Sequence, residues 1–446
     1  MHSCKDITEY INSICTQIRW GRAHERVAEE MEDHIIDSRD AYIAQGLDEP
    51  TATKKAIADT GDATALGLDF DRVHRPKPQW LMLAAVAAFL AIGIIASILF
   101  DGGDIGRRLI FTAVGIAVMF AAYFADFTIL GKYSVLIFFG FITVAVVLLI
   151  NTPINWFHHT FINASLLLFP LVFASCLFGL RGKRIAGVIL ATGAYLILCF
   201  VAALFSATGL FIFMIAGVLL LSIAILKGWF NANKILSLAI AWLPFLVITI
   251  SGIISGSARL IYSFNPHLDP LGSGFVAIQT RRVISGAVFL GEGTVNTDFI
   301  PDRISNSLLT RVIAYYGWLP FLFLIIAIVA FIILGTKKAF YKKNNFGLMV
   351  SLAVLITFTI QAIAYTAYNL GVTIAAMSLP LISPGNAAMV VNMGLIGFML
   401  SVFRSGDVVM EKIISADEKS SKIFTWEDGK LIIDVKAWRD IKSLQQ

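Results

Sequence analysis

The sequence predicts an all-α, polytopic membrane protein with about ten transmembrane helices, a cytoplasmic helical domain in front and a short polar tail behind. Hydrophobic residues make up 57% of the 446 positions and charged residues only 15%, whereas a soluble domain carries roughly 25% charged residues. Apolar runs long enough to cross ~30 Å of hydrocarbon also recur along the middle of the chain. Much of the surface must therefore face lipid.

The front domain, residues 1–78, carries 10 Lys/Arg and 15 Asp/Glu. Apolar residues at helical spacing predict helices over 6–18 and 23–44, and two shorter helices follow over about 50–60 and 63–72. Gly46 and Gly61 are predicted helix stops. No apolar h-region lies near the N-terminus, so we expect no cleavable signal peptide. The predicted core positions of the first two helices are Ile7, Ile11, Ile14, Ile18, Val27, Met31 and Ile35.

Ten apolar runs define a membrane domain over residues 79–404, and the runs at 133–151 and 209–226 are the shortest. With the N-terminus inside, the short inner loops hold ten Lys/Arg and the short outer loops hold only Arg107 and Arg108. The positive-inside rule therefore predicts that both termini are cytoplasmic. The predicted runs are 80–100, 108–128, 133–151, 162–179, 185–205, 209–226, 235–255, 313–335, 346–370 and 384–403.

One outer loop, residues 256–312, is far longer than the others and carries five arginines and four acids among Phe, Ile and Val. Loops of this length in compact proteins are usually functional or disordered. We expect this one to pack as re-entrant or interfacial structure. Asp126, at the inner end of the second run, is an acid in an apolar setting, but its place near the interface favours an ordinary solvated residue.

The tail, residues 405–446, is near neutral. The sequences Phe-Thr-Trp from 424 and Leu-Ile-Ile from 431 flank Glu-Asp-Gly, which predicts a hairpin. The four cysteines suggest no disulfide framework. No Cys/His spacing resembles a zinc site, so we expect no metal ligands.

Two stretches of the membrane domain carry recognisable motifs. The first is RLIYSFNPHLDPLGSGFVAIQT from Arg259, followed by FLGEG at 289–293 and IPDRISN at 300–306. The second is YNLGVTIAAMSLPLISPGNAAMVVNMGLIGFML at 368–400. Both stretches resemble the SEDS proteins of bacterial cell division, elongation and sporulation (the FtsW/RodA/SpoVE family). The resemblance covers residues 80–404. Residues 1–80 resemble a different module, the permease prefix domain, in ITEYINSI, EEMEDHIIDSRDAYIAQGLDEPTATKKAI and GDATALG.

The SEDS resemblance implies a protein of the bacterial cytoplasmic membrane that binds lipid II and polymerises its disaccharide outside, beside a class B penicillin-binding protein. Such chemistry needs cations for the pyrophosphate and a carboxylate that takes a proton from the attacking hydroxyl. No cofactor is evident, although a divalent cation could accompany the lipid pyrophosphate, and we expect no nucleic-acid partner. The substrate-binding residues that the resemblance implies are Arg259, Asp269, Gln279, Arg281, Arg282, Gln361, Asn369 and Ser383. Arg281 and Arg282 have an alternative role as anchors to lipid headgroups.

The chain departs from the family at its expected base, because Asn306 occupies the position of the family's catalytic aspartate. An amide is no general base at neutral pH. Asp302 and Asp298 are the nearby candidates to replace it. Other family landmarks have changed too, at 163–165, 206–209 and 385–387.

Three hypotheses follow from these observations. The first is a SEDS relative that binds lipid II with weakened or lost transferase chemistry. The second is an active polymerase that uses Asp302 or Asp298 as its base. The third is a transporter of lipid-linked substrates.

Overall fold

The computed structural model describes residues 2–75, 78–100, 105–151, 164–254, 258–294, 304–342, 344–373, 377–382, 386–405, 424–427 and 430–433. The chain divides into two compact units, Met1–Arg75 with Val408–Gln446, and Pro76–Asp407.

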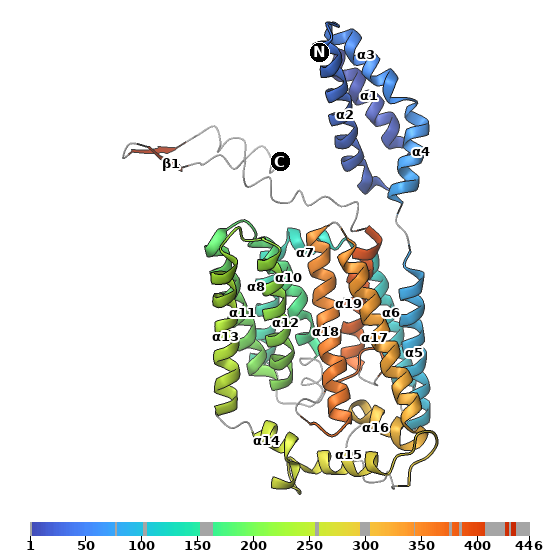
Figure 1. Cartoon of the computed structure of the whole chain (residues 1–446), viewed down its shortest axis with the longest axis vertical. Helices are drawn as coiled ribbons and strands as arrows, with labels where there is room; N and C mark the ends of the chain where they lie inside the picture. Colours follow the sequence, from blue (N-terminus) through green and yellow to red (C-terminus); the bar gives the residue numbers. More distant parts are fainter. Residues whose placement is uncertain are drawn as a thin grey trace. The chain divides into compact units, whose positions relative to one another are not determined.

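The N-terminal helices form a small bundle around one core. The elements are α1 (His2–Gln17), the 3₁₀ turn η1 (Gly21–Ala23), α2 (His24–Ala44), α3 (Glu49–Thr60) and α4 (Ala63–His74) (Figure 1). All seven apolar positions predicted from the helical spacing are buried in this core. The predicted stops are confirmed, since Gly46 and Gly61 adopt φ values of 97° and 103°, a region that favours glycine.

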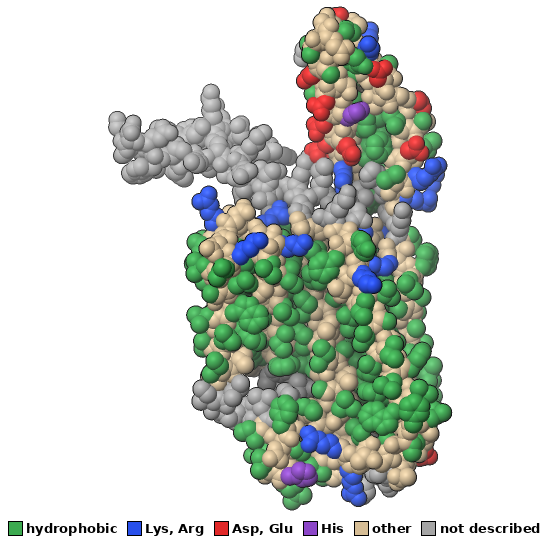
Figure 2. Space-filling model, in the orientation of Figure 1, with side chains coloured by type: hydrophobic (Ala, Val, Ile, Leu, Met, Phe, Trp, Pro, Cys, Tyr) green, Lys and Arg blue, Asp and Glu red, His purple; other side chains and the backbone are tan. Residues whose placement is uncertain are grey.

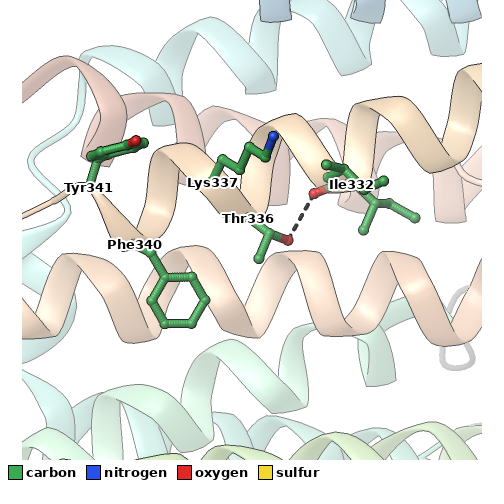
Figure 3. Close-up of a pocket in the computed structure, with 6 residues that line it drawn as sticks. Ile332, Thr336, Lys337, Phe340 and Tyr341 are labelled. Atoms are coloured by element: carbon green, nitrogen blue, oxygen red, sulfur yellow. Dashed lines mark hydrogen bonds between the residues drawn. The ribbon is translucent and has the colours of Figure 1, made fainter.

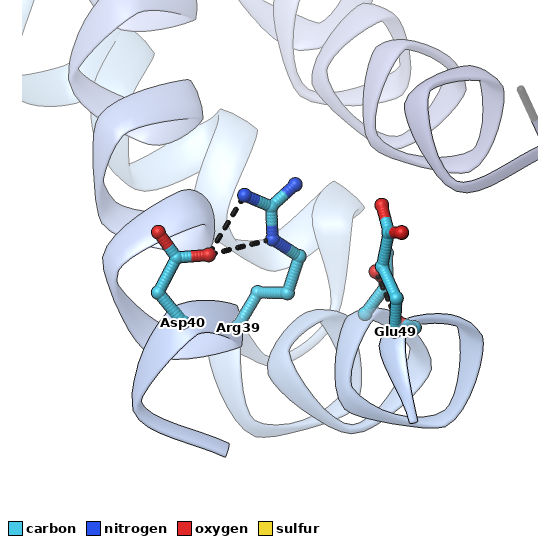
Figure 4. Close-up of polar contacts among 4 residues, drawn as sticks. Arg39, Asp40 and Glu49 are labelled. Carbon is cyan, nitrogen blue, oxygen red and sulfur yellow. Dashed lines mark hydrogen bonds and ion pairs between the residues drawn. The ribbon is translucent and has the colours of Figure 1, made fainter. Parts of the chain in front are cut away.

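Aspartates begin the last two helices of this unit. The carboxylate of Asp48 accepts a hydrogen bond from the backbone N–H of Thr51, and that of Asp62 accepts one from Ala65. These caps satisfy helix N–H groups that have no partner within the helix. On α2, Arg39 donates to Asp40 at 2.7 Å, and Glu49 begins α3 nearby (Figure 4). Asp40 is 59% exposed, so this ion pair contributes little stability.

Helix α4 packs closely against α1 at Gly67, and this contact can be tested. A Cβ there would lie 2.7 Å from the carbonyl oxygen of Ile14. Gly67→Ala should therefore lower the unfolding free energy of this unit by about 1–3 kcal/mol, measured by hydrogen exchange of its core amides in the full chain. Gly21→Ala is the matched control, because its Cβ would meet nothing within 4 Å. Equal protection in the two variants would contradict the packing described here.

The second unit is a bundle of apolar helices, and ten of them correspond to the ten predicted runs. Eight are long enough to cross a membrane, and two, Ser134–Val147 and Leu166–Gly179, are shorter among the residues described. The elements are α5 (Trp80–Phe100), α6 (Ile105–Phe124), α7 (Thr128–Lys132), α8 (Ser134–Asn151), η2 (Leu166–Leu168), α10 (Phe169–Gly179), α11 (Arg184–Phe205), α12 (Ala207–Leu226), α13 (Lys234–Ile254), α17 (Trp318–Phe340), α18 (Asn345–Asn369) and α19 (Asn386–Ser405).

One sequence-based bound needs correction. The eighth span begins at Trp318 rather than at 313, because Gly317 has φ 87° and separates two helices there. The run at 209–226 corresponds to the shortest of the eight long spans, with 18 residues.

The helices differ in how much of their surface faces the protein. Most of α18 is buried, from Phe346 to Asn369, whereas α13 exposes large apolar side chains such as Leu243 and Val247. On the face seen in Figure 2, hydrophobic side chains cover the middle of the bundle, and Lys and Arg lie toward its two ends. This distribution is typical of a membrane-embedded bundle.

Close helix packing occurs between α6 and α19. A Cβ on Gly397 would lie 2.4 Å from the carbonyl oxygen of Met119, so the two backbones approach as small residues allow. At the inner end, the carboxylate of Asp126 accepts a hydrogen bond from the N–H of Thr128. This local turn agrees with the ordinary role expected for Asp126.

The tail contains the predicted hairpin. Strands β1 (Phe424–Glu427) and β2 (Lys430–Ile433) pair antiparallel, with Phe424 opposite Ile433 and Glu427 opposite Lys430.

Candidate functional site

Among the residues described, the long segment predicted to lie outside, residues 256–312 (called the outer segment below), contains short helices. These are α14 (Ala258–Phe264), η3 (Pro266–Leu268), α15 (Phe275–Ser285) and α16 (Ile304–Tyr316). Figure 1 shows α14 and α15 crossing the end of the bundle where α13 ends. The segment therefore packs at the bundle surface, as its apolar content predicts.

Asp269 organises the turn between η3 and α15. Its carboxylate accepts hydrogen bonds from the backbone N–H groups of Gly272, at 3.1 Å, and Ser273, at 2.8 Å. The N–H of Gly274 also bonds to the carbonyl oxygen of Asp269. These contacts commit the carboxylate to the turn, so its expected role in substrate binding stays a prediction.

The glycines of this turn are required by close contacts. A Cβ on Gly274 would lie 2.0 Å from the carbonyl oxygen of Pro266, and one on Gly272 would lie 2.4 Å from the Asp269 carboxylate. The DPLGSG sequence thus encodes one compact turn that begins α15.

Arg281 joins the outer segment to the end of α18. Its Nε donates to the carbonyl oxygen of Gly371 at 3.1 Å, and its Nη2 donates to that of Ser263 at 3.0 Å. Gly371 has φ 85°, and a Cβ there would lie 2.6 Å from Cγ of Arg281. The guanidinium thus joins α15 to α14 and to the residues after α18. This structural role was not predicted for Arg281, for which the sequence suggested binding of substrate or lipid headgroups.

Asn369, at the end of α18, holds the beginning of α16. Its Nδ2 donates to the carbonyl oxygens of Asn306 and Tyr365, at 2.8 and 2.9 Å. Its Oδ1 accepts from the backbone N–H of Thr310 at 2.9 Å and from the Thr310 hydroxyl at 3.0 Å. The Tyr365 hydroxyl accepts from the N–H of Leu308. This cluster fixes the backbone around a kink at Ser307, where φ is −112°.

Asn306 is therefore held at the junction of α16 and α18, half-buried. The outer segment's described acids are Asp269, committed to its turn, and Glu292, exposed in the loop before α16. Asp298 and Asp302 lie outside the described residues. Among the residues described, no group of three or more His, Cys, Asp or Glu could hold a metal ion.

Gln361 pairs with Asn392 between α18 and α19. Each amide donates to the other, at 3.2 and 3.3 Å, and both side chains are about 1% exposed. The pair satisfies two polar groups that would otherwise face an apolar interior. Asn392 was missed by the sequence reasoning, although an amide within an apolar run is itself a signal.

Arg108 is a further residue that the sequence reasoning missed as a site candidate. It lies in α6, is 4% exposed, and donates from Nη2 to the carbonyl oxygen of Ile382 at 2.9 Å. Gly93 of α5 leaves room for it, since a Cβ there would lie 2.3 Å from Nη2. Leu381 has φ 66°, an unusual conformation for leucine. Arg108 thus holds the Leu379–Ile382 stretch of the second motif.

The remaining candidate residues are less defined. Arg259 lies in α14, but its side chain is not described, and Ser383 lies outside the described residues. Gln279 is half-buried on α15, and Arg282 is exposed on the same helix. The structure therefore brings Arg281, Asn306 and Asn369 together around the outer end of α18, while Gln361 lies deeper in the bundle.

Solved structures of known proteins resemble this chain in fold. No family model matches the chain. A solved chain from a peptidoglycan synthase complex that coordinates polymerization and crosslinking superposes with a TM-score of 0.57 at 16% identity, covering 73% of this chain and 98% of that one. Thermus thermophilus RodA, a rod shape determining protein, gives 0.50 at 17% identity, covering 74% and 97%.

Curated proteins of the same kind are also similar to this chain in sequence. A probable peptidoglycan glycosyltransferase FtsW of Geobacter metallireducens is 25% identical over 177 residues, 38% of this chain and 46% of that protein. The peptidoglycan glycosyltransferase MrdB of Escherichia coli K12 is 26% identical over 155 residues, 32% and 40%. The chain has the SEDS fold and is similar in sequence to SEDS proteins over part of its length. Its alignments span less than half the length of these curated relatives.

The Asn369 cluster generates a prediction about this SEDS fold. Asn369→Ala should lower the unfolding free energy of the membrane unit by about 2–4 kcal/mol, because each buried polar group left without a partner costs about 1–3 kcal/mol. Thermal unfolding in detergent measures the effect. Thr359→Ala is the control on the same helix, since its hydroxyl bonds only to the carbonyl oxygen of Leu355. Similar melting temperatures for the two variants would contradict a stabilising role for the Asn369 cluster.

Arg108 generates a second prediction. Arg108→Met should destabilise the membrane unit by about 1–3 kcal/mol, because the buried Ile382 carbonyl loses its donor. Its exposed neighbour provides the control: Arg107→Met should stay within about 0.5 kcal/mol of the native protein. The unfolding free energy of both variants is measured in the same detergent. If Arg107→Met destabilises the protein more than Arg108→Met does, Arg108 does not stabilise the Leu379–Ile382 stretch.

Proposed function

We propose that this protein binds lipid II, the lipid-linked disaccharide precursor of peptidoglycan, with weakened or lost glycosyltransferase chemistry. The observation that carries the proposal is Asn306. It occupies the position where the resemblance to SEDS proteins expects a catalytic aspartate, and its amide has no basicity at neutral pH.

The frame around that position supports binding rather than simple loss of the site. Asn369, Thr310 and Tyr365 hold the start of α16 through hydrogen bonds between buried groups. Arg281 holds α15 against the end of α18. These contacts give the described part of the outer segment a fixed shape, which lowers the ordering cost of binding a ligand there.

Positive charge supports an anionic ligand. The segment 256–312 carries five arginines against four acids, and Arg282 is exposed on α15. Guanidinium groups bind phosphate oxygens through paired hydrogen bonds. The pyrophosphate of a lipid-linked sugar is the ligand this charge suits.

A working polymerase is the second candidate, and two acids favour it. Asp298 and Asp302 lie a few residues before Asn306 in the sequence. Either could accept the proton from the attacking sugar hydroxyl if it reaches the same place.

Asn306→Asp separates these two functions. Purified native protein should bind fluorescent lipid II in nanodiscs and form little or no polymer, while Asn306→Asp should raise polymer formation, by up to about 10²-fold if a base is all that is lacking. Asn306→Ala is the control for the loss of the amide. If the native protein already polymerises and Asn306→Ala abolishes this, Asn306 takes part in an active site and the weakened chemistry is wrong.

Failure to bind lipid II at all would reject the ligand itself. The same assays are run with and without a class B penicillin-binding protein, the partner we propose from the resemblance. We also propose that residues 1–78 are the prefix module and serve as a cytoplasmic contact.

A further inference from the structure

An open apolar groove runs along the last turns of α17, at the end of the bundle opposite the outer segment. Its volume is about 390 Å³, and it is lined by Ile332, Ile333, Thr336, Lys337, Phe340 and Tyr341. Figure 3 shows these residues along α17, with the hydroxyl of Thr336 bonded to the carbonyl oxygen of Ile332. Because that hydroxyl is satisfied within the helix, the wall of the groove is effectively apolar.

The groove lies on the exposed side of α17, near the end of its apolar stretch. Ile333 is 48% exposed, Phe340 56% and Tyr341 85%. Aromatic side chains are enriched where hydrocarbon meets the polar interface. An acyl chain can therefore lie along Ile333 and Phe340 while its headgroup sits beside Tyr341.

One lysine lines the groove, and two more lie close to it in the sequence. Lys337 lines it and is exposed, and Lys338 and Lys342 follow within two turns. The sequence from 303 to 406 contains no Asp or Glu. The ligand that such a groove favours is therefore anionic as well as apolar.

Contacts with other helices fix the end of α17. Lys338 donates to the side-chain oxygen of Gln79, and the Gln79 amide donates to the carbonyl oxygen of Phe403 at 3.4 Å. On the inner face, Gly335 and Ala339 are buried. These contacts fix the helix turns that form the groove, and a preformed groove lowers the entropy cost of binding a ligand.

We propose that this groove binds an anionic glycerophospholipid, with one acyl chain along Ile333 and Phe340 and the phosphate beside Lys337. The site is independent of the proposed lipid II site, because it lies at the other end of the bundle and uses none of its residues.

The test measures how phospholipid raises the melting temperature of the full-length protein in detergent. Titration with dioleoyl-phosphatidylglycerol should stabilise the native protein at concentrations where dioleoyl-phosphatidylcholine does not. Lys337→Gln should weaken the apparent affinity for phosphatidylglycerol about fivefold, which corresponds to about 1 kcal/mol for one lysine near an anionic surface. Ile333→Trp, which fills the groove, should weaken it as well, although it leaves every charge in place.

Lys227→Gln is the matched control. Lys227 is exposed at the end of α12, outside the groove, and the change removes the same charge. The native response should persist in this variant. An equal loss in Lys227→Gln and Lys337→Gln would show only a general attraction to the basic end, and an equal response to the two lipids would show no headgroup selection. Either result overturns the proposal, as does an unchanged response in Ile333→Trp.

Discussion

The structure depends on one constraint: hydrocarbon offers no hydrogen-bond partners, so polar groups inside the bundle must be satisfied by the protein itself. Asn369 and Gln361 meet this requirement with partners on other helices, and Arg108 donates from Nη2 to the carbonyl oxygen of Ile382. Each of these contacts joins elements far apart in sequence. The polar residues of the membrane unit therefore act first as fasteners between helices, and any contact with substrate is added to that role.

This constraint explains how the site can keep its shape whichever side chain stands at position 306. The backbone at Asn306 is bonded through its carbonyl to Asn369, a contact that is indifferent to the side chain at 306. The frame can persist whether that position carries an acid or an amide. The hydrogen bonds around position 306 therefore depend on the backbone and on Asn369, not on the chemistry of the residue 306 side chain.

Much of the fold could be predicted because its causes are local. The apolar runs, the glycine stops at 46 and 61 and the hairpin at 424–433 each follow from a few neighbouring residues. The error at Trp318 has a local cause too, since Gly317 divides an apolar stretch that otherwise continues. The site was less predictable. Motif matching indicated Asn369 and Arg281, but their bonds to Thr310 and Gly371 join segments that only folding brings together.

The sequence by itself determined that this chain crosses a membrane and where most of its helices lie. Hydrophobic length and residue identity are sufficient for these conclusions. Only the tertiary structure decided what the polar residues do, because a hydrogen-bond partner is set by distance in space. It turned Gln361 into the partner of Asn392, and it turned Arg108, a short-loop residue in the sequence, into a buried support for Ile382.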